Sequence, residues 1–327
     1  MLEGADRSHC LVADVGGTNV RFAMAPLDAA GPLVDPRAWR LADFDGPEDA
    51  VRAYLQALAP TERPRTAMLA IAAPVDGDQI GMINGHWRFS LAETRRALGF
   101  DHLHALNDFA ANAWGVAELE PSDLLGLGAT TPDPSAEGSF LVLGTGTGLG
   151  VASLRRDGRG RLTIGGTEGG HVAFAPLDEE EDALLAWLRP RFGRLSYERL
   201  LSGPGLTLLH HLLAGGPDLA PELIIARAAE GEAEAKRSVE LFCAILGSFA
   251  GDAALIHGAW NGIFLAGSMI EALAAPLTAG AFRRRFEEKG RYAARLAAIP
   301  TAIVLQPALG LLGAAGALRH QLAEKQP

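Results

Sequence analysis

The feature that most restricts the fold of this 327-residue chain is a strand, turn, strand pattern that occurs twice, about 130 residues apart. The first copy, at residues 9–25, reads as apolar HCLVAD, the turn cluster GGTN and alternating VRFAMA. The second copy starts at residue 139 and reads SFLVL, GTGTGLG and VASLRR. Both read as hairpins, because β-prone runs flank Gly-rich turns. The repeat predicts a duplicated mixed β-sheet core. Gly-rich turns are common in α/β enzymes, so an unduplicated α/β fold is the alternative.

Runs of helical and strand type follow each hairpin, and this alternation predicts an α/β chain. The segment 120–138 is rich in Pro, Gly, Thr and acidic residues and reads as a domain junction. A chain of this length, 48% apolar, also exceeds the ~100–200 residues of one domain. Helices are expected at 46–58, 90–98, 108–119, 179–189, 197–213, 234–257 and 309–324, and further strands at 66–73, 102–106, 262–266 and 301–305.

Composition excludes several functions. The formal charge of −10 argues against a nucleic-acid surface, since such surfaces neutralise phosphates with clustered Lys and Arg. Apolar runs such as SFLVL and GIFLA fall short of the ~18–20 residues of a membrane span, and the N-terminus has no signal-peptide pattern. A cytoplasmic protein without membrane or nucleic-acid partners is expected. Cys10 and Cys243 lie in apolar runs and are expected to be buried free thiols.

The sequence argues against a lysine-based phosphate site and against a metal site built from clustered His and Cys ligands. Its three lysines, Lys236, Lys289 and Lys325, stand among polar neighbours and are expected at helix surfaces or ends. No glycine precedes a lysine, so there is no Walker A motif, and no HExxH or CxxC spacing occurs. Any phosphate site must therefore use backbone N–H groups, hydroxyls and a metal ion.

Both turns have the parts of such a phosphate grip. Glycines let backbone N–H groups approach an anion, Thr and Asn side chains add neutral donors, and Asp14 can hold Mg²⁺ through water. The GTGTGLG segment is no dinucleotide fingerprint, because Leu149 stands where a third glycine would fall and a strand follows. A nucleotide bound between the halves is expected, and ordinary tight turns are the alternative. The expected nucleotide contacts in the turns are Asp14, Gly16, Gly17, Thr18, Asn19, Gly144, Thr145, Gly146 and Thr147.

Asn107 and Asp108 lie where a strand ends and a helix begins, so their side chains can reach a cleft. Asp108 would accept the proton of an attacking hydroxyl while Asn107 orients a sugar. Helix capping is the alternative, because Asn and Asp favour that position.

Three further polar residues stand beside glycines or a helix start: Glu168, His171 and Glu198. Carboxylates and a neutral imidazole are groups that bind vicinal sugar hydroxyls. The structural alternatives are a loop acid, a partly buried histidine and a first-turn glutamate. The acidic run 178–182 is interpreted as a helix start that matches the helix dipole.

The ordered set DVGGTN, LNDF, GTGTGLG, EGGH, SYERLLSGPG and FLAGS resembles the bacterial glucokinase family of the hexokinase, actin and sugar-kinase superfamily. The likeness covers about residues 10 to 320. It implies an α/β, two-domain actin-like (ribonuclease H-like) sugar kinase fold with a duplicated mixed β-sheet core and an interdomain cleft. The smaller domain would comprise 1–118 plus 308–327 and the larger 119–307, with the last helix packing on the first domain.

The resemblance also implies ATP-dependent, Mg²⁺-assisted phosphorylation of D-glucose to glucose 6-phosphate, which feeds glycolysis, by a homodimer. In the family the aspartate of the NDF motif is the catalytic base, which falls here on Asp108. Gly267 opens the adenosine segment, where the usual second glycine is replaced by Ser268. The family's glucose ligands fall here on Asn107, Glu168, His171 and Glu198.

Two other classes of protein are alternatives to the kinase that this resemblance implies. A ROK-type kinase or repressor would carry a cysteine-rich zinc motif after its EGH segment, whereas AFAPLDEEED follows here, and no DNA-binding helix pair precedes Leu11. A catalytically silent sugar-binding protein would have lost the base or a phosphate turn. Asp108, Asp14 and both turns are present, which favours the kinase.

Overall fold

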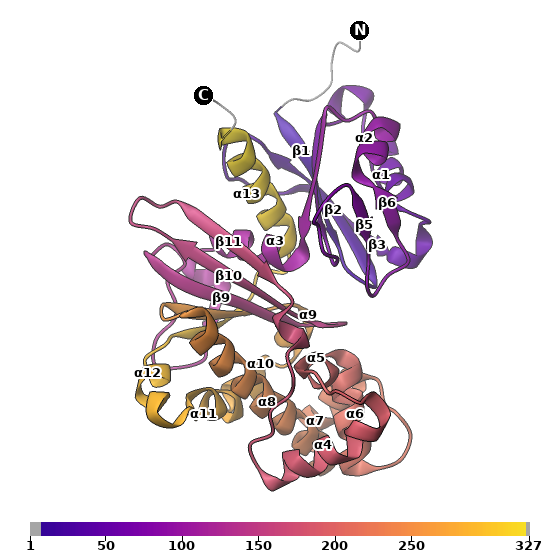
Figure 1. Ribbon diagram of the computed structural model, residues 1–327. Helices are drawn as coiled ribbons and strands as arrows, with labels where there is room; N and C mark the ends of the chain where they lie inside the picture. Colours follow the sequence, from indigo (N-terminus) through magenta and orange to yellow (C-terminus); the bar gives the residue numbers. More distant parts are fainter. Residues whose placement is uncertain (1–7, 325–327) are drawn as a thin grey trace. The chain divides into compact units, whose positions relative to one another are not determined.

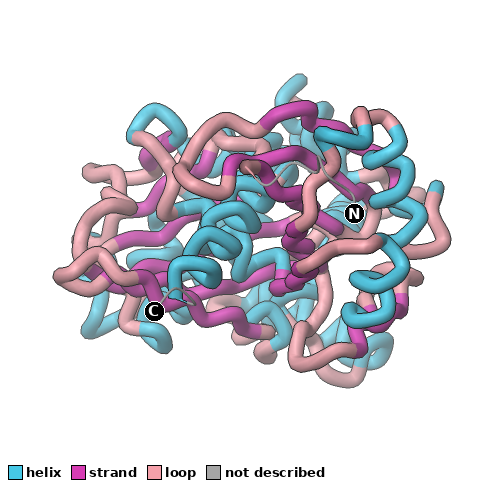
Figure 2. The backbone as a smooth tube through the Cα atoms, turned by 90° about the horizontal axis from the view of Figure 1, so that it is seen from above, coloured by secondary structure: helices cyan, strands magenta, loops and turns pink. Residues whose placement is uncertain are grey.

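The computed structural model describes residues 8–324 of the chain, and these form two compact units. The first unit runs from the first described residue to Leu119 and takes in the C-terminal segment from Ala308. The second unit is the continuous stretch Glu120–Pro307. Each unit contains a mixed β-sheet with helices packed on it (Figures 1 and 2).

The sheet of the first unit has the strand order β3-β2-β1-β4-β7. The first three strands are antiparallel neighbours, and β4 and β7 run parallel to β1. The strands are β1 (His9–Val15), β2 (Asn19–Pro26), β3 (Val34–Arg40), β4 (Thr66–Ile71) and β7 (His102–Asn107), and a small separate ribbon is formed by β5 (Gln79–Gly81) and β6 (Arg88–Ser90).

Alternation along β1 gives the first unit two cores. Leu11 and Ala13 face the side that contains Tyr54 and Trp87, whereas Cys10 and Val12 face the opposite side. Successive side chains of a strand point to opposite faces, so a strand buried on both sides is apolar throughout. The helices of this unit are α1 (Pro47–Gln56), α2 (Leu91–Leu98), α3 (Asp108–Val116) and α13 (Leu309–Glu324).

Helix α13 covers the Cys10 and Val12 face of the sheet and packs closely on α3. A Cβ atom at Gly313 would collide with the Ala111 carbonyl, and one at Gly115 with the Leu309 carbonyl. Only glycine at these positions lets the two helix backbones approach so closely. The C-terminal helix is therefore part of the first unit's core.

The sheet of the second unit has the order β11-β10-β9-β12-β13-β8. Its first five strands repeat the plan of the first sheet: two antiparallel neighbours on one side of the central strand and two parallel strands on the other. The mixed core is duplicated, as predicted. The strands are β8 (Leu124–Gly126), β9 (Gly138–Thr145), β10 (Leu149–Arg156), β11 (Leu162–Thr167), β12 (Gly262–Ala266) and β13 (Thr301–Val304).

Helix α8 (Ala233–His257) forms the centre of the second unit's core. By length and composition it is the one described helix that could cross a membrane, but 78% of its most apolar window is buried inside the protein. That burial is typical of a core helix. The other helices of this unit are α4 (Glu179–Phe192), α5 (Tyr197–Leu200), α6 (Gly203–Ala214), α7 (Pro221–Glu230), α9 (Ser268–Ala272), α10 (Ala274–Thr278), α11 (Ala281–Glu287) and α12 (Ala293–Ala297).

Some local predictions were wrong. The single helix expected at 197–213 is two helices, because the chain turns at Leu201 and Ser202 and the Ser202 hydroxyl caps α6 by accepting the Gly205 N–H at 3.2 Å. Helices α7 and α9 to α12 and strands β5, β6, β8 and β11 were not predicted. Lys289, expected at the surface, has a side chain only 7% exposed.

One charged residue of the predicted acidic helix start is also buried. Glu181, in the acidic start of α4, is fully buried and lies 2.8 Å from the Arg285 guanidinium. The helix-start interpretation still holds, because the Asp178 side chain accepts the Glu181 N–H. Cys10 and Cys243 are buried free thiols, as expected, and burial raises the pKa of Cys10 to about 11 and of Cys243 to about 12.

Candidate active site

The turn between β1 and β2 is closed by a hydrogen bond from the Gly16 N–H to the Asn19 carbonyl, 2.9 Å. The side chains of Thr18 and Asn19 are exposed, and Gly16 and Gly17 are partly exposed. The predicted residues therefore lie together at the tip of one hairpin, with polar groups directed to solvent. This arrangement is compatible with contacts to an anion.

Asp14 lies two residues before Gly16, the first residue of the turn, and is paired across the hairpin with Arg21. The Arg21 guanidinium donates to the Asp14 carboxylate at 3.1 Å, and the two side chains are 43% and 22% exposed. Burial raises the pKa of Asp14, and the Arg21 charge opposes that shift. Arg21 was not predicted as a site residue, although the pairing of residues across a short hairpin indicates its place opposite Asp14.

The Asp14 carboxylate also lies against the first turn of α13. A Cβ atom added at Gly310 would stand 3.0 Å from Asp14 Cγ and 3.2 and 3.3 Å from the two carboxylate oxygens. Because Gly310 has no Cβ atom, the Asp14 carboxylate can lie close to the α13 backbone.

Asn107 ends β7 and caps α3. Its side-chain oxygen accepts the N–H groups of Phe109 and Ala110 at 2.9 and 3.1 Å, and its amide donates to the Ala73 carbonyl at 3.4 Å. The capping interpretation is thus correct for Asn107. Asp108 is the first residue of α3, is partly exposed, and accepts its neighbour's Phe109 N–H at 2.9 Å.

The turn between β9 and β10 differs from the first in its contacts. Gly144 and Thr145 still belong to β9, and Gly144 is paired with both β10 and β12 inside the sheet. The turn begins at Gly146, whose N–H donates to the Gly148 carbonyl at 2.9 Å and whose carbonyl accepts the Gly203 N–H at 2.8 Å. Thr147 is exposed at the tip.

Thr145 and Gly267 lie next to each other at the ends of β9 and β12. The Thr145 hydroxyl is buried and has no hydrogen-bond partner. Gly267 has φ 107°, and a Cβ atom there would stand 3.2 Å from the Thr145 carbonyl oxygen. A left-handed glycine and an unsatisfied hydroxyl in one place suit a ligand that offers a polar atom. Ser268 begins α9 in ordinary helical geometry, so it fits without strain.

Three predicted sugar ligands meet in the second unit although they come from separate segments. His171 Nε2 lies 3.8 Å from a carboxylate oxygen of Glu168 and 3.8 Å from one of Glu198. The side chains of Glu168, His171 and Glu198 are 59%, 46% and 23% exposed. Two carboxylates and an imidazole thus converge at a solvent-accessible place, which is a suitable set for vicinal hydroxyls.

The backbone of Leu149, beside the second turn, connects these segments. Its N–H donates to the Glu198 carboxylate at 3.1 Å. A Cβ atom at Gly170 would collide with the Leu149 carbonyl, so the EGGH segment passes directly over this residue. The predicted sugar ligands are therefore attached to the same hairpin as the second glycine turn.

The chain's residues fit a nucleotide and Mg²⁺. The unsatisfied Thr145 hydroxyl and the open space beside Gly146 suit a phosphate or ribose group. Across residues 8–324, no three His, Cys, Asp or Glu side chains gather into a metal cage. Mg²⁺ is commonly held by one or two carboxylates together with substrate phosphates, and Asp14 offers one such carboxylate.

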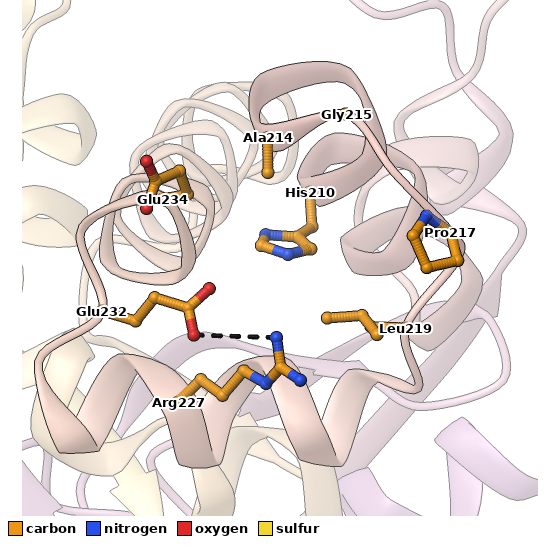
Figure 3. A pocket seen from close by; sticks show the side chains of 8 residues that line it. All are labelled: His210, Ala214, Gly215, Pro217, Leu219, Arg227, Glu232 and Glu234. Atoms are coloured by element: carbon orange, nitrogen blue, oxygen red, sulfur yellow. Dashed lines mark ion pairs between the residues drawn. The ribbon is translucent and has the colours of Figure 1, made fainter.

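A separate cavity of about 320 Å³ lies between α6, α7 and the start of α8 (Figure 3). His210 enters it, with Nδ1 3.0 Å from the Ser238 hydroxyl, and Arg227 pairs with Glu232 at 3.7 Å on its wall. None of the predicted site residues lines this cavity.

Comparison with known proteins decides the family. The glucokinase family model matches residues 11–321. The chain belongs to the glucokinase family. It is 42% identical over 315 residues to a glucokinase of Xanthomonas euvesicatoria pv. vesicatoria (strain 85-10), covering 93% of each protein. It is 40% identical over 321 residues to a glucokinase of Stenotrophomonas maltophilia (strain K279a), covering 95% of each.

Solved structures agree with this assignment. The crystal structure of a glucokinase from an Antarctic psychrotroph matches with TM-score 0.81 at 31% identity, covering 96% of this chain and 100% of that one. A glucokinase from Balamuthia mandrillaris in complex with glucose has the same fold, with TM-score 0.81 at 24% identity and coverage of 96% and 94%. The predicted family, the α/β actin-like fold class and the function as an ATP-dependent glucose kinase are confirmed.

Proposed function

We propose that this member of the glucokinase family transfers the γ-phosphoryl group of ATP to the 6-hydroxyl of D-glucose with the residues described above, and that Mg²⁺ assists. The observation that carries the proposal is the convergence of Glu168, His171 and Glu198 on one place. Two carboxylates and an imidazole offer directional acceptors and a donor for the vicinal hydroxyls of a sugar.

Sugar binding falls to the neutral and acidic side chains. Glu168 and Glu198 accept hydrogen bonds from sugar hydroxyls, and His171 both accepts and donates through its two ring nitrogens. The Asn107 oxygen is occupied as a helix cap, so this residue acts through its side-chain N–H groups. A site that satisfies hydroxyls in this way rejects analogues that lack one, because its polar groups would be left unpaired.

Asp108 is the catalytic base. It lies at the N-terminus of α3, where its carboxylate accepts the proton of the attacking 6-hydroxyl. The transition state of phosphoryl transfer is loose, so positioning and charge neutralisation matter more than a strong base. A carboxylate beside a helix N-terminus meets that need.

The phosphates of ATP are contacted by the two turns. Thr18, Asn19 and the backbone of the first turn, together with Thr145, Gly146 and Thr147, supply neutral donors, and Gly267 admits the adenosine portion. Mg²⁺, held through water by Asp14, would neutralise charge on the transferred group. Arg21 adds a positive charge beside Asp14 in a site that lacks a phosphate-binding lysine.

The cellular setting follows from the same reaction. The product, glucose 6-phosphate, would enter glycolysis, and the enzyme would act in the cytoplasm. Family resemblance favours a homodimer. Gel filtration with light scattering on the purified protein measures its mass directly, and a monomer would contradict the dimer.

A coupled assay tests the function. Purified protein with Mg-ATP is given glucose, fructose, mannose, galactose and N-acetylmannosamine in turn, with ADP as a control donor. We expect a strong preference for glucose and ATP. Preference for another sugar would overturn the substrate, and no turnover on any sugar would overturn the proposal.

A further inference from the structure

Glu198 is held in place by more than its own contacts. It is the second residue of α5, a helix of only four residues, and such a short helix has little stability of its own. Something outside α5 must fix the direction of the carboxylate. The neighbouring residue, Tyr197, is the part of α5 that enters the core.

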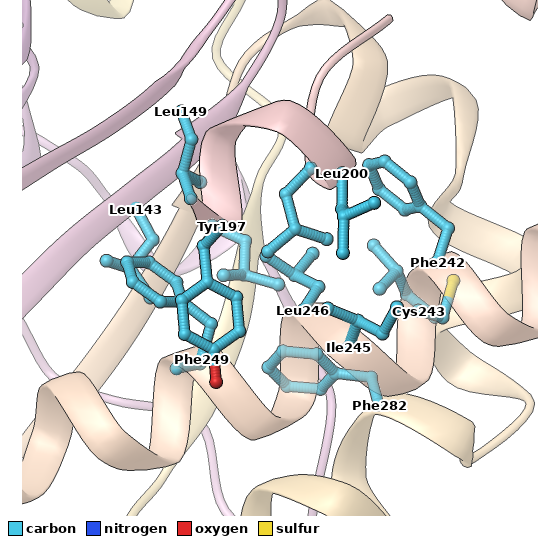
Figure 4. Packing of buried hydrophobic residues seen from close by; sticks show 14 of the residues in the cluster. Leu143, Leu149, Tyr197, Leu200, Phe242, Cys243, Ile245, Leu246, Phe249 and Phe282 are labelled. Atoms are coloured by element: carbon cyan, nitrogen blue, oxygen red, sulfur yellow. The ribbon is translucent and has the colours of Figure 1, made fainter. Parts of the chain in front are cut away.

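The Tyr197 ring is 2% exposed and packs between two aromatic rings. The Phe174 ring stands edge-on with its centroid 5.4 Å away. The Phe249 ring lies tilted with its centroid 4.9 Å away, and Figure 4 shows it beside Tyr197. Phe174 follows the EGGH segment by three residues, and Phe249 belongs to α8. The ring thus joins α5, the EGGH segment and the central helix of the unit.

The Tyr197 hydroxyl contacts an ion pair formed by Asp252 and Lys289. It donates to the Asp252 carboxylate at 3.4 Å, and Lys289 Nζ lies 2.6 Å from the other oxygen of that carboxylate. Lys289 also donates to the Ser248 carbonyl at 2.9 Å. Burial and the Asp252 charge raise the pKa of Tyr197, so the phenol stays protonated and donates.

Gly251 makes room for this arrangement. A Cβ atom there would stand 2.5 Å from Lys289 Cε, so the lysine stem lies directly across the α8 backbone. Lysine is rarely buried unless it is paired, and the side chain of this one is only 7% exposed. Gly251 and the buried Lys289 therefore hold the Asp252 carboxylate beside the Tyr197 hydroxyl.

The far side of α5 is tied to the sugar-binding segment by the backbone. The Tyr197 N–H donates to the Val172 carbonyl at 3.0 Å, and the Phe174 N–H donates to the Leu195 carbonyl at 2.9 Å. Arg194 donates to the His171 carbonyl at 2.8 Å. A shift of Tyr197 would move Glu198 and the EGGH segment together.

We propose that Tyr197 is a positioning residue for sugar binding: its hydroxyl, held by the Asp252 and Lys289 pair, fixes α5 and thereby aims the Glu198 carboxylate. The inference rests on the proposed function, in which Glu198 binds glucose. A purely structural role would affect stability alone, whereas a positioning role changes glucose affinity through Glu198.

The test compares steady-state kinetics of Tyr197→Phe with those of Tyr54→Phe. Tyr54 is a matched control, because it is also fully buried and its hydroxyl donates one hydrogen bond, to the Asp35 carbonyl at 3.0 Å in the first unit. We expect Tyr197→Phe to raise the KM for glucose by about 3- to 10-fold, the loss of one hydrogen bond, with kcat and the KM for ATP retained. Lys289→Met should shift the KM for glucose in the same direction.

The double variant Tyr197→Phe/Glu198→Gln separates the outcomes. If Tyr197 acts through Glu198, Tyr197→Phe adds no further rise in KM once Glu198 is changed. An unchanged KM in Tyr197→Phe, or an equal rise on both backgrounds, would overturn the positioning role while leaving the sugar site intact. If Glu198→Gln alone leaves the KM for glucose unchanged, the assignment of Glu198 fails, and the inference fails with it.

Discussion

The turn between β1 and β2 lies beside a carboxylate and a guanidinium, whereas residues 144–150 around the turn between β9 and β10 carry no charge. Both turns join the central strand of a sheet to its antiparallel neighbour, so their backbone setting is the same. Their surroundings differ. In the first unit, Asp14 lies against the N-terminal turn of α13. In the second unit, the Leu149 N–H donates to the Glu198 carboxylate, and the Gly146 carbonyl accepts the Gly203 N–H.

The two halves of the duplicated core thus share a topology, but the groups around their turns differ in charge. In the proposed function, the first unit carries the groups that handle charge and protons, Asp14, Arg21 and Asp108. The second turn offers neutral donors and an attachment for the sugar ligands. Loss of Asp108 or Asp14 should therefore lower kcat, whereas losses around the second turn should raise a KM.

The largest effect is expected for Asp108→Asn. Removal of the base should lower kcat by roughly 10²–10⁴-fold with the KM for glucose nearly unchanged. Stopped-time assays with excess enzyme would measure the residual rate, and circular dichroism would check the fold. Turnover at the wild-type rate would exclude Asp108 as the base and weaken the contrast between the units.

A smaller loss is expected for Asp14→Asn. Groups that orient a metal through water typically contribute about 10–100-fold to activity, and kcat should fall by that factor. The Mg²⁺ concentration for half-maximal rate should rise as well. A kcat and Mg²⁺ dependence equal to wild type would show that the first turn's charge has no part in the reaction.

The same substitution should raise stability near pH 7. Burial raises the pKa of Asp14 above its ordinary 3.8, so the folded state disfavours the ionised carboxylate and loses stability as the pH rises through the folded-state pKa. Asparagine removes that cost. Melting curves should show a higher Tm for Asp14→Asn at pH 7, and the gain should disappear below about pH 3.8, where the wild-type carboxyl is protonated in both states. A lower Tm at pH 7 would mean that the Arg21 pair outweighs burial.

The smallest effect concerns the second turn. Thr145→Val removes the buried, unsatisfied hydroxyl and keeps the shape of the side chain. We expect the KM for ATP to rise by about 3- to 10-fold, the worth of one hydrogen bond, with the KM for glucose unchanged. Thr145→Ser is the matched control and should retain the wild-type KM. Equal values for the valine and serine variants would show that the hydroxyl makes no contact with the nucleotide.

Local pattern was sufficient for the elements that position the site. The two hairpins, the strand before Asn107 and the helix that starts at Asp108 follow from turn residues, alternation and capping, all of which act within a few residues. Contacts between distant segments could not be read in this way. The bond from Leu149 to Glu198 spans 49 residues, and only the folded chain brings its two groups together.

The burial of charged side chains could not be predicted from the sequence either. Lys289 and Glu181 stand among polar neighbours in the sequence, yet each is buried because a partner from another helix compensates its charge. A prediction from local sequence uses only the residues near each position along the chain. It therefore cannot include an ion-pair partner that comes from a distant segment. Arg21 was missed for a related reason, since its importance depends on the strand opposite.

The place of α13 has a consequence for how the protein is made. The sheet face of Cys10 and Val12 stays uncovered during synthesis until α13 has been made. The first residue of α13 leaves the ribosome about 190 residues after the end of α3. At a synthesis rate of about 5–20 residues per second, that delay lasts on the order of ten to forty seconds. During this time the second unit, which is continuous in sequence, can fold first, while the emerging first unit exposes an apolar surface of the kind that chaperones bind.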